Sequence, residues 1–285
     1  MQRSDFRFFE RLRVRWAEID AQKIVFNGHY LMYFDTAVAG YWRALGVPYA
    51  QTMASFDGDL FVRKAEVEYI ASARYDDVLD VGMRCARVGT SSAVFVGGAF
   101  RDQQLLVSCT LTYVFADPEG TASKPVPREL RELFDRFERG ESMVDVRVGS
   151  WTELGADARP IRTQVFITEQ KIPAEMEWDD ADDAAIHAVA YNRLGQALAT
   201  GRMLEHVPGV AKIGRMAVAA SSRHSGVGRA VLEALLDAAR SRGEREAVLH
   251  AQLTAAPFHE RAGFVRRGPE FDETGIAHVE MLRAL

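Results

Sequence analysis

The chain has 285 residues, 48% of them hydrophobic, and a formal net charge of −5 at pH 7. This length exceeds the usual size of one domain, so we expect two domains, and the negative charge argues against nucleic acid as a partner. No apolar run approaches the roughly 20 residues that span a bilayer and no secretory signal precedes the first expected strand, so we expect a cytoplasmic protein with no membrane partner.

The first part of the chain predicts one long helix and an antiparallel sheet. A β-type run ends at Trp16, and a polar turn carrying Asp20 follows it. A helix is predicted from about Gly28 to Leu45, because one helical stripe holds Tyr30, Phe34, Val38, Tyr41 and Leu45. Four strand-like runs follow, at about 60–72, 78–88, 92–101 and 105–116. A sheet wrapped around one long helix is the arrangement of a hotdog fold.

The spacing of Asp20, Tyr30-Leu31 and Phe34, with the run Tyr75-Asp-Asp77-Val-Leu-Asp80, resembles the 4-hydroxybenzoyl-CoA thioesterase family. The resemblance covers about residues 8–136. It implies an acyl-CoA substrate and makes Asp20 the nucleophile or general base of thioester hydrolysis. It also implies a homodimer or homotetramer, because hotdog sites usually form between two protomers.

The resemblance places the donors for the thioester carbonyl at the start of the helix, where the helix dipole is positive. These donors are backbone N–H groups of Val25, Phe26, Asn27 and Gly28, with assistance from His29. Lys23 stands where the family often has glycine. The alternative interpretation makes Asp20 a solvated turn residue or an Asx cap.

A domain boundary is expected near residues 138–143, where Glu138-Arg-Gly-Glu-Ser142 is short and polar. The segment 117–127 before it is rich in proline and turn formers. We therefore expect a hotdog domain over 1–140 and a second domain over 141–285. Cys85 and Cys109 lie in expected strands, which indicates reduced buried thiols, and no cluster of histidine and cysteine predicts a metal site.

The second part contains an expected strand, a glycine-containing loop and a helix. The strand is Ile213–Val218, the loop is Arg223-His-Ser-Gly-Val-Gly228, and the helix begins at Arg229 and ends at Gly243. Val231, Leu235 and Ala238 or Ala239 fall on one helical face. Another strand is expected at Ala247–Gln252. Glycines at a helix N-terminus let backbone N–H groups approach an anion, so a pyrophosphate suits this loop, although such a loop is also found as a plain tight turn.

The Arg-x-x-Gly-x-Gly loop between that strand and that helix, followed by Phe258–Phe264, resembles the GCN5-related N-acetyltransferase (GNAT) family. Further matching segments are Val165–Gln170, Ile186–Ala190, Thr200–Met203 and Thr274–His278. The resemblance covers about residues 143–285. It implies a mixed, largely antiparallel sheet, so the predicted class of the whole chain is α+β. It also implies acetyl-CoA as a substrate and an unidentified amine as acceptor.

This second resemblance assigns candidate site residues. The pyrophosphate lies on the loop amides of Arg223, His224, Ser225, Gly226, Val227 and Gly228, and the pantetheine pairs with Met216, Ala217 and Val218. Gln252 matches a position that contacts CoA. His259 stands where the family has a tyrosine general acid, and histidine can donate a proton near neutral pH.

The acceptor amine must lose a proton, and the candidate bases are Glu169 and His187. The alternative for Glu169 is a structural carboxylate, and for His187 a core residue. The acidic run Glu177–Asp183 is interpreted as a solvated loop, or as an attractor for a cationic amine.

Three hypotheses for the whole chain follow. The first is a bifunctional enzyme with acyl-CoA thioesterase and N-acetyltransferase halves. The second is an acetyltransferase whose hotdog domain serves dimerisation or acyl-CoA binding. The third is a CoA-sensing or assembly protein without turnover. Asp20 favours the first hypothesis over the second.

Overall fold

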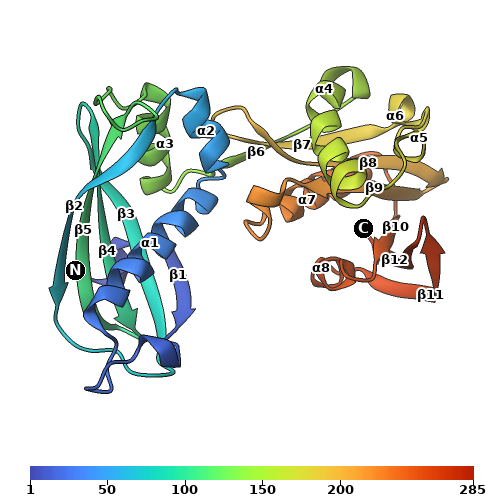
Figure 1. Ribbon diagram of the computed structural model, residues 1–285. Coiled ribbons are helices and arrows are strands. Elements are labelled where there is room, and N and C mark those ends of the chain that lie inside the picture. Colours follow the sequence, from blue (N-terminus) through green and yellow to red (C-terminus); the bar gives the residue numbers. More distant parts are fainter. The chain divides into compact units, whose positions relative to one another are not determined.

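The computed structural model describes residues 1–285, and the chain forms two compact units, Met1–Met143 and Val144–Leu285 (Figure 1). Each unit has its own sheet and its own buried core. No helix in the chain combines the length and the apolar character that a membrane crossing requires.

The first unit is a five-stranded antiparallel sheet with the strand order β1-β3-β4-β5-β2. Its strands are β1 (Phe8–Arg13), β2 (Asp59–Tyr69), β3 (Val78–Val88), β4 (Ser92–Arg101) and β5 (Gln104–Ala116). Its helices are α1 (Asn27–Ala44), α2 (Tyr49–Ser55) and α3 (Arg128–Glu138), with short 3-10 turns η1 (Arg3–Asp5) and η2 (Trp16–Glu18).

Helix α1 lies across the sheet (Figure 1). The predicted stripe is confirmed, because all five of its side chains are buried. Gly97 of β4 lets the helix approach closely, since a Cβ there would lie 2.8 Å from the ring of Phe34. The predicted helix and strands are all present. Two strands end earlier than expected: the first ends at Arg13 rather than at Trp16, and β2 ends at Tyr69 rather than near residue 72.

The second unit is a seven-stranded sheet with the order β11-β12-β10-β9-β8-β7-β6. Its strands are β6 (Val144–Gly149), β7 (Ile186–Asn192), β8 (Ala197–Val207), β9 (Val210–Val218), β10 (Glu246–Gln252), β11 (Val265–Glu273) and β12 (Ile276–Ala284). Its helices are α4 (Trp151–Arg162), the π-helix η3 (Thr163–Glu169), α5 (Ala174–Glu177), α6 (Ala181–Ala184), the 3-10 turn η4 (Ala220–Ser222), α7 (Val227–Ser241) and α8 (Ala256–Arg261).

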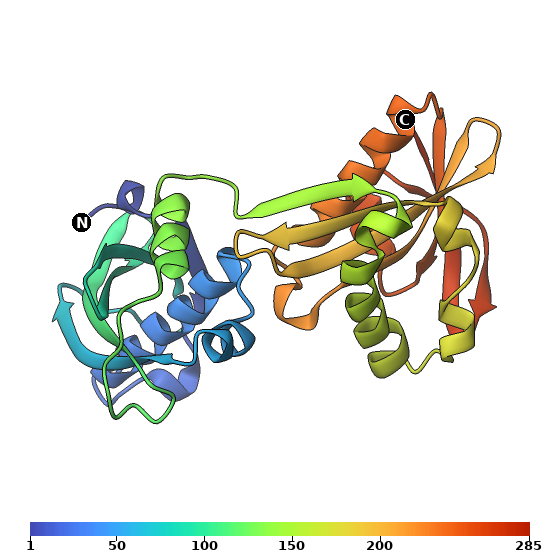
Figure 2. The ribbon, with the colours of Figure 1, turned by 90° about the horizontal axis from the view of Figure 1, so that it is seen from above.

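Helices α4 and α7 cover opposite faces of this sheet (Figure 2). Successive side chains of a strand point to opposite faces, so Ala188 of β7 packs in the α7 core and Val189 in the α4 core. The predicted apolar face of α7 is buried, including Val231 and Leu235. Gly243 follows the helix with φ of +81°, which glycine adopts without strain.

Strands β9 and β10 form the only parallel pair of the second sheet, and they separate part-way along. They pair from Val210 opposite Glu246 to Ile213 opposite Leu249 and no further. Both strands continue, to Val218 and Gln252 respectively. The separation leaves backbone groups of both strands without their sheet partner.

Candidate active sites

In the first unit, Asp20 lies in a tight loop that leads into α1. The loop is closed by a bridge between Ile19 and Val25 and by the Asp20 N–H donating to the Ile24 carbonyl at 2.9 Å. Lys23 has φ of +62°. Glycine reaches this backbone region without strain, so the conformation explains why glycine suits the position. Lys23 therefore preserves the turn at a conformational cost.

The Asp20 carboxylate divides its two oxygens between different surroundings. Its Oδ1 accepts hydrogen bonds from the N–H groups of Gln22, at 2.8 Å, and Ile24, at 3.5 Å. This is the Asx turn of the alternative interpretation. Its Oδ2 accepts no hydrogen bond from the protein, so one oxygen shapes the loop and the other is free to act on a ligand.

Glu18 anchors the loop from inside. Its side chain is 3% exposed and accepts hydrogen bonds from the Arg15 N–H, at 2.7 Å, and the Tyr33 hydroxyl, at 2.6 Å. Burial alone would raise the pKa of Glu18, but these donors and the Arg15 guanidinium hold that pKa below its usual value. Because Tyr33 belongs to α1, the ionised Glu18 ties the loop to the helix.

Of the four backbone N–H groups predicted to bind the thioester carbonyl, only two are free in the structure. The Val25 N–H donates to the Ala73 carbonyl and the Phe26 N–H to the Glu18 carbonyl, both at 2.9 Å. The expectation that these two amides are open donors is therefore wrong. Asn27 and Gly28 are the first two residues of α1, and their N–H groups have no backbone acceptor. His29 keeps a buried Nδ1 without a hydrogen-bond partner.

In the second unit, a cleft of about 480 Å³ lies where β9 and β10 separate. Both separating strands line it, through residues 212–216 and 249–252. Met216 and Gln252 line the cleft, whereas Ala217 and Val218 do not. Ala217 is 2% exposed and belongs to an apolar cluster. Gln252 donates to the side-chain oxygen of Gln170 at 3.0 Å.

The predicted phosphate loop has open amides at the N-terminus of α7. Gly226 is the N-cap of this helix with φ of +87°, and His224 has φ of +65°. The N–H groups from His224 to Gly228 donate to no protein acceptor. Gly228 fits closely, because a Cβ there would lie 3.0 Å from a methyl group of Val218. Such a row of free donors at a helix N-terminus suits a phosphate.

Comparison with known proteins agrees with this geometry. Residues 22–108 match the thioesterase superfamily, and residues 155–285 match the acetyltransferase (GNAT) domain family. YjcF of Bacillus subtilis (strain 168), named an uncharacterized N-acetyltransferase, is 34% identical over 128 residues, which are 45% of this chain and 90% of YjcF. The chain belongs to the GNAT family, and its first domain is similar to the thioesterase superfamily. A thioesterase-superfamily domain is followed by a GNAT domain.

Two solved structures are similar to one domain each. An acyl-CoA N-acyltransferase from Pseudomonas aeruginosa is 32% identical, with a TM-score of 0.45, and the match covers 50% of this chain and 99% of that one. A thioesterase-superfamily structure from Jannaschia sp. CCS1 is 21% identical, with a TM-score of 0.44, and the match covers 47% of this chain and 94% of that one.

In the GNAT domain, His259 lines the cleft but is not an ordinary acid. It is 7% exposed between the rings of Phe258 and Phe264, and burial lowers its pKa to about 4. The imidazole is therefore neutral at pH 7, which corrects the expectation that it donates a proton as an imidazolium. Its Nδ1 is buried without a partner, so the neutral ring has a free hydrogen-bonding atom.

The two predicted bases are both engaged elsewhere. The Glu169 carboxylate accepts two hydrogen bonds from the Arg223 guanidinium, at 2.6 and 2.8 Å, which hold its pKa below the usual value. Glu169 does not line the cleft. His187 is 1% exposed, and its Nε2 lies 2.9 Å from the Asp182 carbonyl oxygen. This arrangement supports the structural alternative for both residues.

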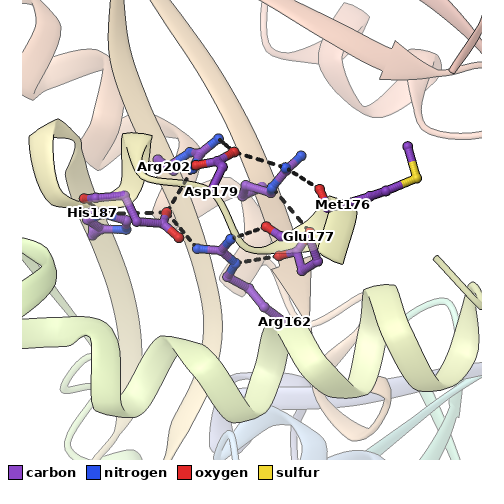
Figure 3. A network of polar contacts seen from close by, with 8 residues as sticks. Arg162, Met176, Glu177, Asp179, His187 and Arg202 are labelled. Carbon is purple, nitrogen blue, oxygen red and sulfur yellow. Dashed lines mark hydrogen bonds and ion pairs between the residues drawn. The ribbon is translucent and has the colours of Figure 1, made fainter. Parts of the chain in front are cut away.

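Two carboxylates of the acidic run 177–183 are buried, which corrects the interpretation of the whole run as a solvated loop, while Asp180 and Asp183 are exposed. Both buried carboxylates, Glu177 and Asp182, bind Arg162, a side chain of α4 that is 1% exposed, and Figure 3 shows Glu177 turned toward it. Arg162 donates to Glu177 at 2.5 Å and to Asp182 at 2.8 Å. Its guanidinium also lies over the ring of Trp178, 4.7 Å from the ring centroid.

Two more arginines extend this network to the cleft. Arg202 of β8 donates to Asp179 at 2.5 Å and to Asp182 at 2.8 Å (Figure 3). Arg215 of β9 pairs with Glu177 at 3.2 Å and with Asp179 at 3.3 Å. Three guanidinium groups thus face three carboxylates, which balances their charge. Glu177, Arg202 and Arg215 also line the cleft, so the network forms one of its walls.

Three further residues that line the cleft were not predicted as site residues from the sequence: His250, Glu273 and His278. The segment Thr274–His278 contributed to the family resemblance, but no chemical role followed from it. Their positions on three different strands bring them together only in the folded sheet.

Proposed function

We propose that the chain is a bifunctional CoA-dependent enzyme. The thioesterase-superfamily domain hydrolyses an acyl-CoA thioester, and the GNAT domain transfers acetyl from acetyl-CoA to an amine. The observation that carries the proposal is that each domain has free backbone donors at a helix N-terminus beside a suitable site: Asn27 and Gly28 next to the Asp20 loop, and His224–Gly228 next to the cleft.

In the proposed hydrolysis, Asp20 acts through Oδ2 in one of two ways. It either takes a proton from a water molecule that attacks the thioester carbon, or attacks that carbon itself to form a mixed anhydride that water then hydrolyses. The Asn27 and Gly28 N–H groups hold the carbonyl oxygen as negative charge develops on it, which is the function of an oxyanion hole. The carbon–sulfur bond breaks, the sulfur takes a proton, and the products are a carboxylic acid and CoA. Glu18 holds the Asp20 loop against α1, because it accepts hydrogen bonds from the Arg15 N–H and from the Tyr33 hydroxyl of the helix.

In the proposed acetyl transfer, the pyrophosphate of acetyl-CoA lies on the amides of His224–Gly228. The pantetheine runs along the backbone of Gly214–Met216, where β9 has separated from β10. The acetyl group then lies in the cleft between Gln252 and His259. The neutral His259 supplies a hydrogen bond to the substrate rather than a proton.

We also propose that the first domain associates through β2. This strand is an edge of its sheet, and Phe61, Val62, Tyr69 and the adjoining Ile70 are exposed. Exposed apolar side chains along a free strand edge favour pairing with another chain. A second copy of the domain would cover them, and hotdog sites usually need two protomers.

An alternative is an acetyltransferase whose first domain only binds acyl-CoA or dimerises. The observation that favours it is the Asx turn, because it gives Asp20 a structural reason to be present. In that case replacement of the Asp20 carboxylate would not reduce the enzymatic activity of the protein.

The test is thiol release from a panel of acyl-CoAs without an amine, followed by acetyl-CoA with a panel of amines. The wild type is compared with Asp20→Asn, which keeps the Asx acceptor but loses the charge. Asp102→Asn is the matched control, since Asp102 is an exposed turn residue with φ of +52°. The association state is measured by light scattering on the same samples.

We expect release from at least one acyl-CoA to fall by more than about a hundredfold in Asp20→Asn and to stay unchanged in Asp102→Asn. Equal release in both variants would contradict the role of Asp20. No release by the wild type, with amine acetylation present, would favour the alternative. No turnover in either assay would contradict the proposed function as a whole.

A further inference from the structure

The three missed residues form a polar wall of the GNAT cleft on neighbouring strands. His278 of β12 lies directly opposite Gln252 of β10 in the antiparallel ladder, and Phe271 of β11 lies opposite His278 on the other side. Directly opposed residues project to the same face, with Cβ atoms about 5 Å apart. His278 is therefore next to Gln252, which also lines the cleft.

The hydrogen bond of His278 decides which nitrogen is basic. Its Nδ1 lies 2.8 Å from the Ile276 carbonyl oxygen. A carbonyl oxygen only accepts, so Nδ1 carries the hydrogen and Nε2 carries the lone pair in the neutral ring. Nε2 has no hydrogen-bond partner in the protein. The Phe271 ring stacks on the imidazole at 6.0 Å and 23°, which fixes the plane of the ring.

Several other ionisable groups of the cleft have partners of their own. His250 lies 3.3 Å from Glu273 and 3.9 Å from Glu280. Glu280 is also paired with Arg267 at 2.6 Å. On the opposite wall, the carboxylate of Glu177 is neutralised by arginines of the network. His278 is 8% exposed and combines a free ring nitrogen with an orientation fixed by a hydrogen bond and a stacked ring. His259 also has a ring nitrogen without a partner, but it is buried between two phenylalanine rings, and burial lowers its pKa to about 4, which makes it a weak base.

We propose that His278 is the general base that deprotonates the acceptor amine, and that the acceptor is an alkylamine that arrives as an ammonium ion. The assignment rests on the acetyl transfer proposed above. The carboxylate of Glu273, which is half exposed beside His250, supplies the negative charge that attracts the ammonium. This places the acceptor between β10, β11 and β12, on the side of Gln252.

The protons balance as follows. Nε2 of His278 takes one proton from the ammonium, and the freed nitrogen lone pair forms a bond to the acetyl carbon. The carbon–sulfur bond breaks with its electron pair on sulfur, and the second proton lost by nitrogen goes to that sulfur. His278 then releases its proton to solvent, which leaves a neutral amide, CoA and one proton in solution.

Other titratable groups face His278 and would shape its pH response. They are His250 and His259 from β10 and α8, Glu273 from β11, Glu280 with Arg267 along the same strands, and Glu177, Arg202, Lys212 and Arg215 on the opposite wall. A pH profile must therefore be compared between variants rather than assigned to one group from the wild type alone.

The decisive variant is His278→Asn, which keeps a donor near the Nδ1 position but has no basic nitrogen. The full-length protein is assayed with acetyl-CoA and two isomeric amines, 2-phenylethylamine and 4-ethylaniline. The first is an alkylamine that is protonated at neutral pH. The second is an arylamine that is neutral there and has no ammonium proton to lose before attack. His206→Asn is the control, since His206 is exposed on β8 and does not line the cleft.

We expect kcat for 2-phenylethylamine to fall by about 10²–10⁴-fold in His278→Asn, with an unchanged KM for acetyl-CoA. The loss for 4-ethylaniline should stay below about tenfold. Equal losses for both amines would show a structural role and overturn the assignment, as would full activity. Where the wild type uses only alkylamines, the variant should lose the acidic limb of the pH profile of kcat, and an unchanged profile overturns the assignment.

A measurement without turnover separates this inference from the proposed function. In the full chain labelled with ¹⁵N-histidine, the long-range spectrum of His278, identified by its absence in His278→Asn, should show a protonated Nδ1 near neutral pH. A hydrogen on Nε2 instead would overturn the base assignment even if acetyl transfer is present. Absence of acetylation of every amine by the wild type would overturn the proposed function and this assignment together.

Discussion

Replacement of Asp182 by asparagine should strongly destabilise the GNAT domain. The Asp182 side chain is buried, and its Oδ1 accepts hydrogen bonds from Arg162 and Arg202, both at 2.8 Å. The change leaves three guanidinium groups facing two carboxylates in a buried network. Removal of one partner from a buried ion pair costs about 3–5 kcal/mol, a large part of the total stability of a domain.

The assay is urea unfolding of the full-length chain, with hydrogen exchange measured on peptides from residues 151–203. The exchange data assign the loss to the domain that carries the network. Asp183→Asn is the matched control, because Asp183 is the exposed neighbour in the same helix. We expect the control to change the free energy of unfolding by less than about 0.5 kcal/mol.

The effect should also depend on pH in a defined direction. Burial raises the pKa of Asp182, but hydrogen bonds from Arg162 and Arg202 outweigh it and hold that pKa below its usual value. A lowered pKa in the folded state means that the stabilisation is complete above the unfolded value of about 3.9 and is lost as pH falls through the folded value. The difference between wild type and Asp182→Asn should therefore shrink only in acid. Equal unfolding free energies at pH 7 would refute the reasoning.

Three further outcomes are expected. Glu18→Gln should lower the unfolding free energy of the first domain by about 1.5–3 kcal/mol at pH 7, because buried hydrogen bonds to a charged carboxylate are lost, whereas the exposed Glu119→Gln should not. Lys23→Gly should keep Asp20-dependent thiol release and leave stability equal or higher by up to about 1 kcal/mol, because φ is +62° there; a marked loss of stability would count against the turn geometry. Burial lowers the pKa of His259 to about 4, so between about pH 6.5 and 4 the folded state binds fewer protons than the unfolded state. The unfolding free energy of the GNAT domain should therefore decrease as the pH is lowered through that window, and the decrease should be smaller in His259→Leu. Parallel curves of unfolding free energy against pH for both proteins would contradict this.

The long helix of each domain follows from local patterns of the sequence, whereas the two folds were expected from family resemblances. The stripe from Tyr30 to Leu45 and the face of α7 with Val231 and Leu235 are repeats of apolar residues at helical spacing, and burial of that face is the only way to remove them from water. The loop at Gly226 could be predicted for a similar reason, because its positive φ favours glycine.

The ionisation and pairing of polar residues were decided by the tertiary structure. Glu169 and Arg223 are 54 positions apart, and only the packing of η3 beside the loop before α7 makes them partners. The acidic run 177–183 has the composition of a solvated loop, but Arg162 and Arg202 from other elements pair with its residues Glu177, Asp179 and Asp182.

The same holds for the histidines of the cleft. His259 has its pKa lowered because Phe258 and Phe264 surround it, and His278 has a defined tautomer because the chain turns the Ile276 carbonyl toward it. A sequence determines which groups can ionise and where the chain can turn. The charge that each group then carries depends on desolvation and on partners within a few ångströms, and strand register over long sequence separations sets both.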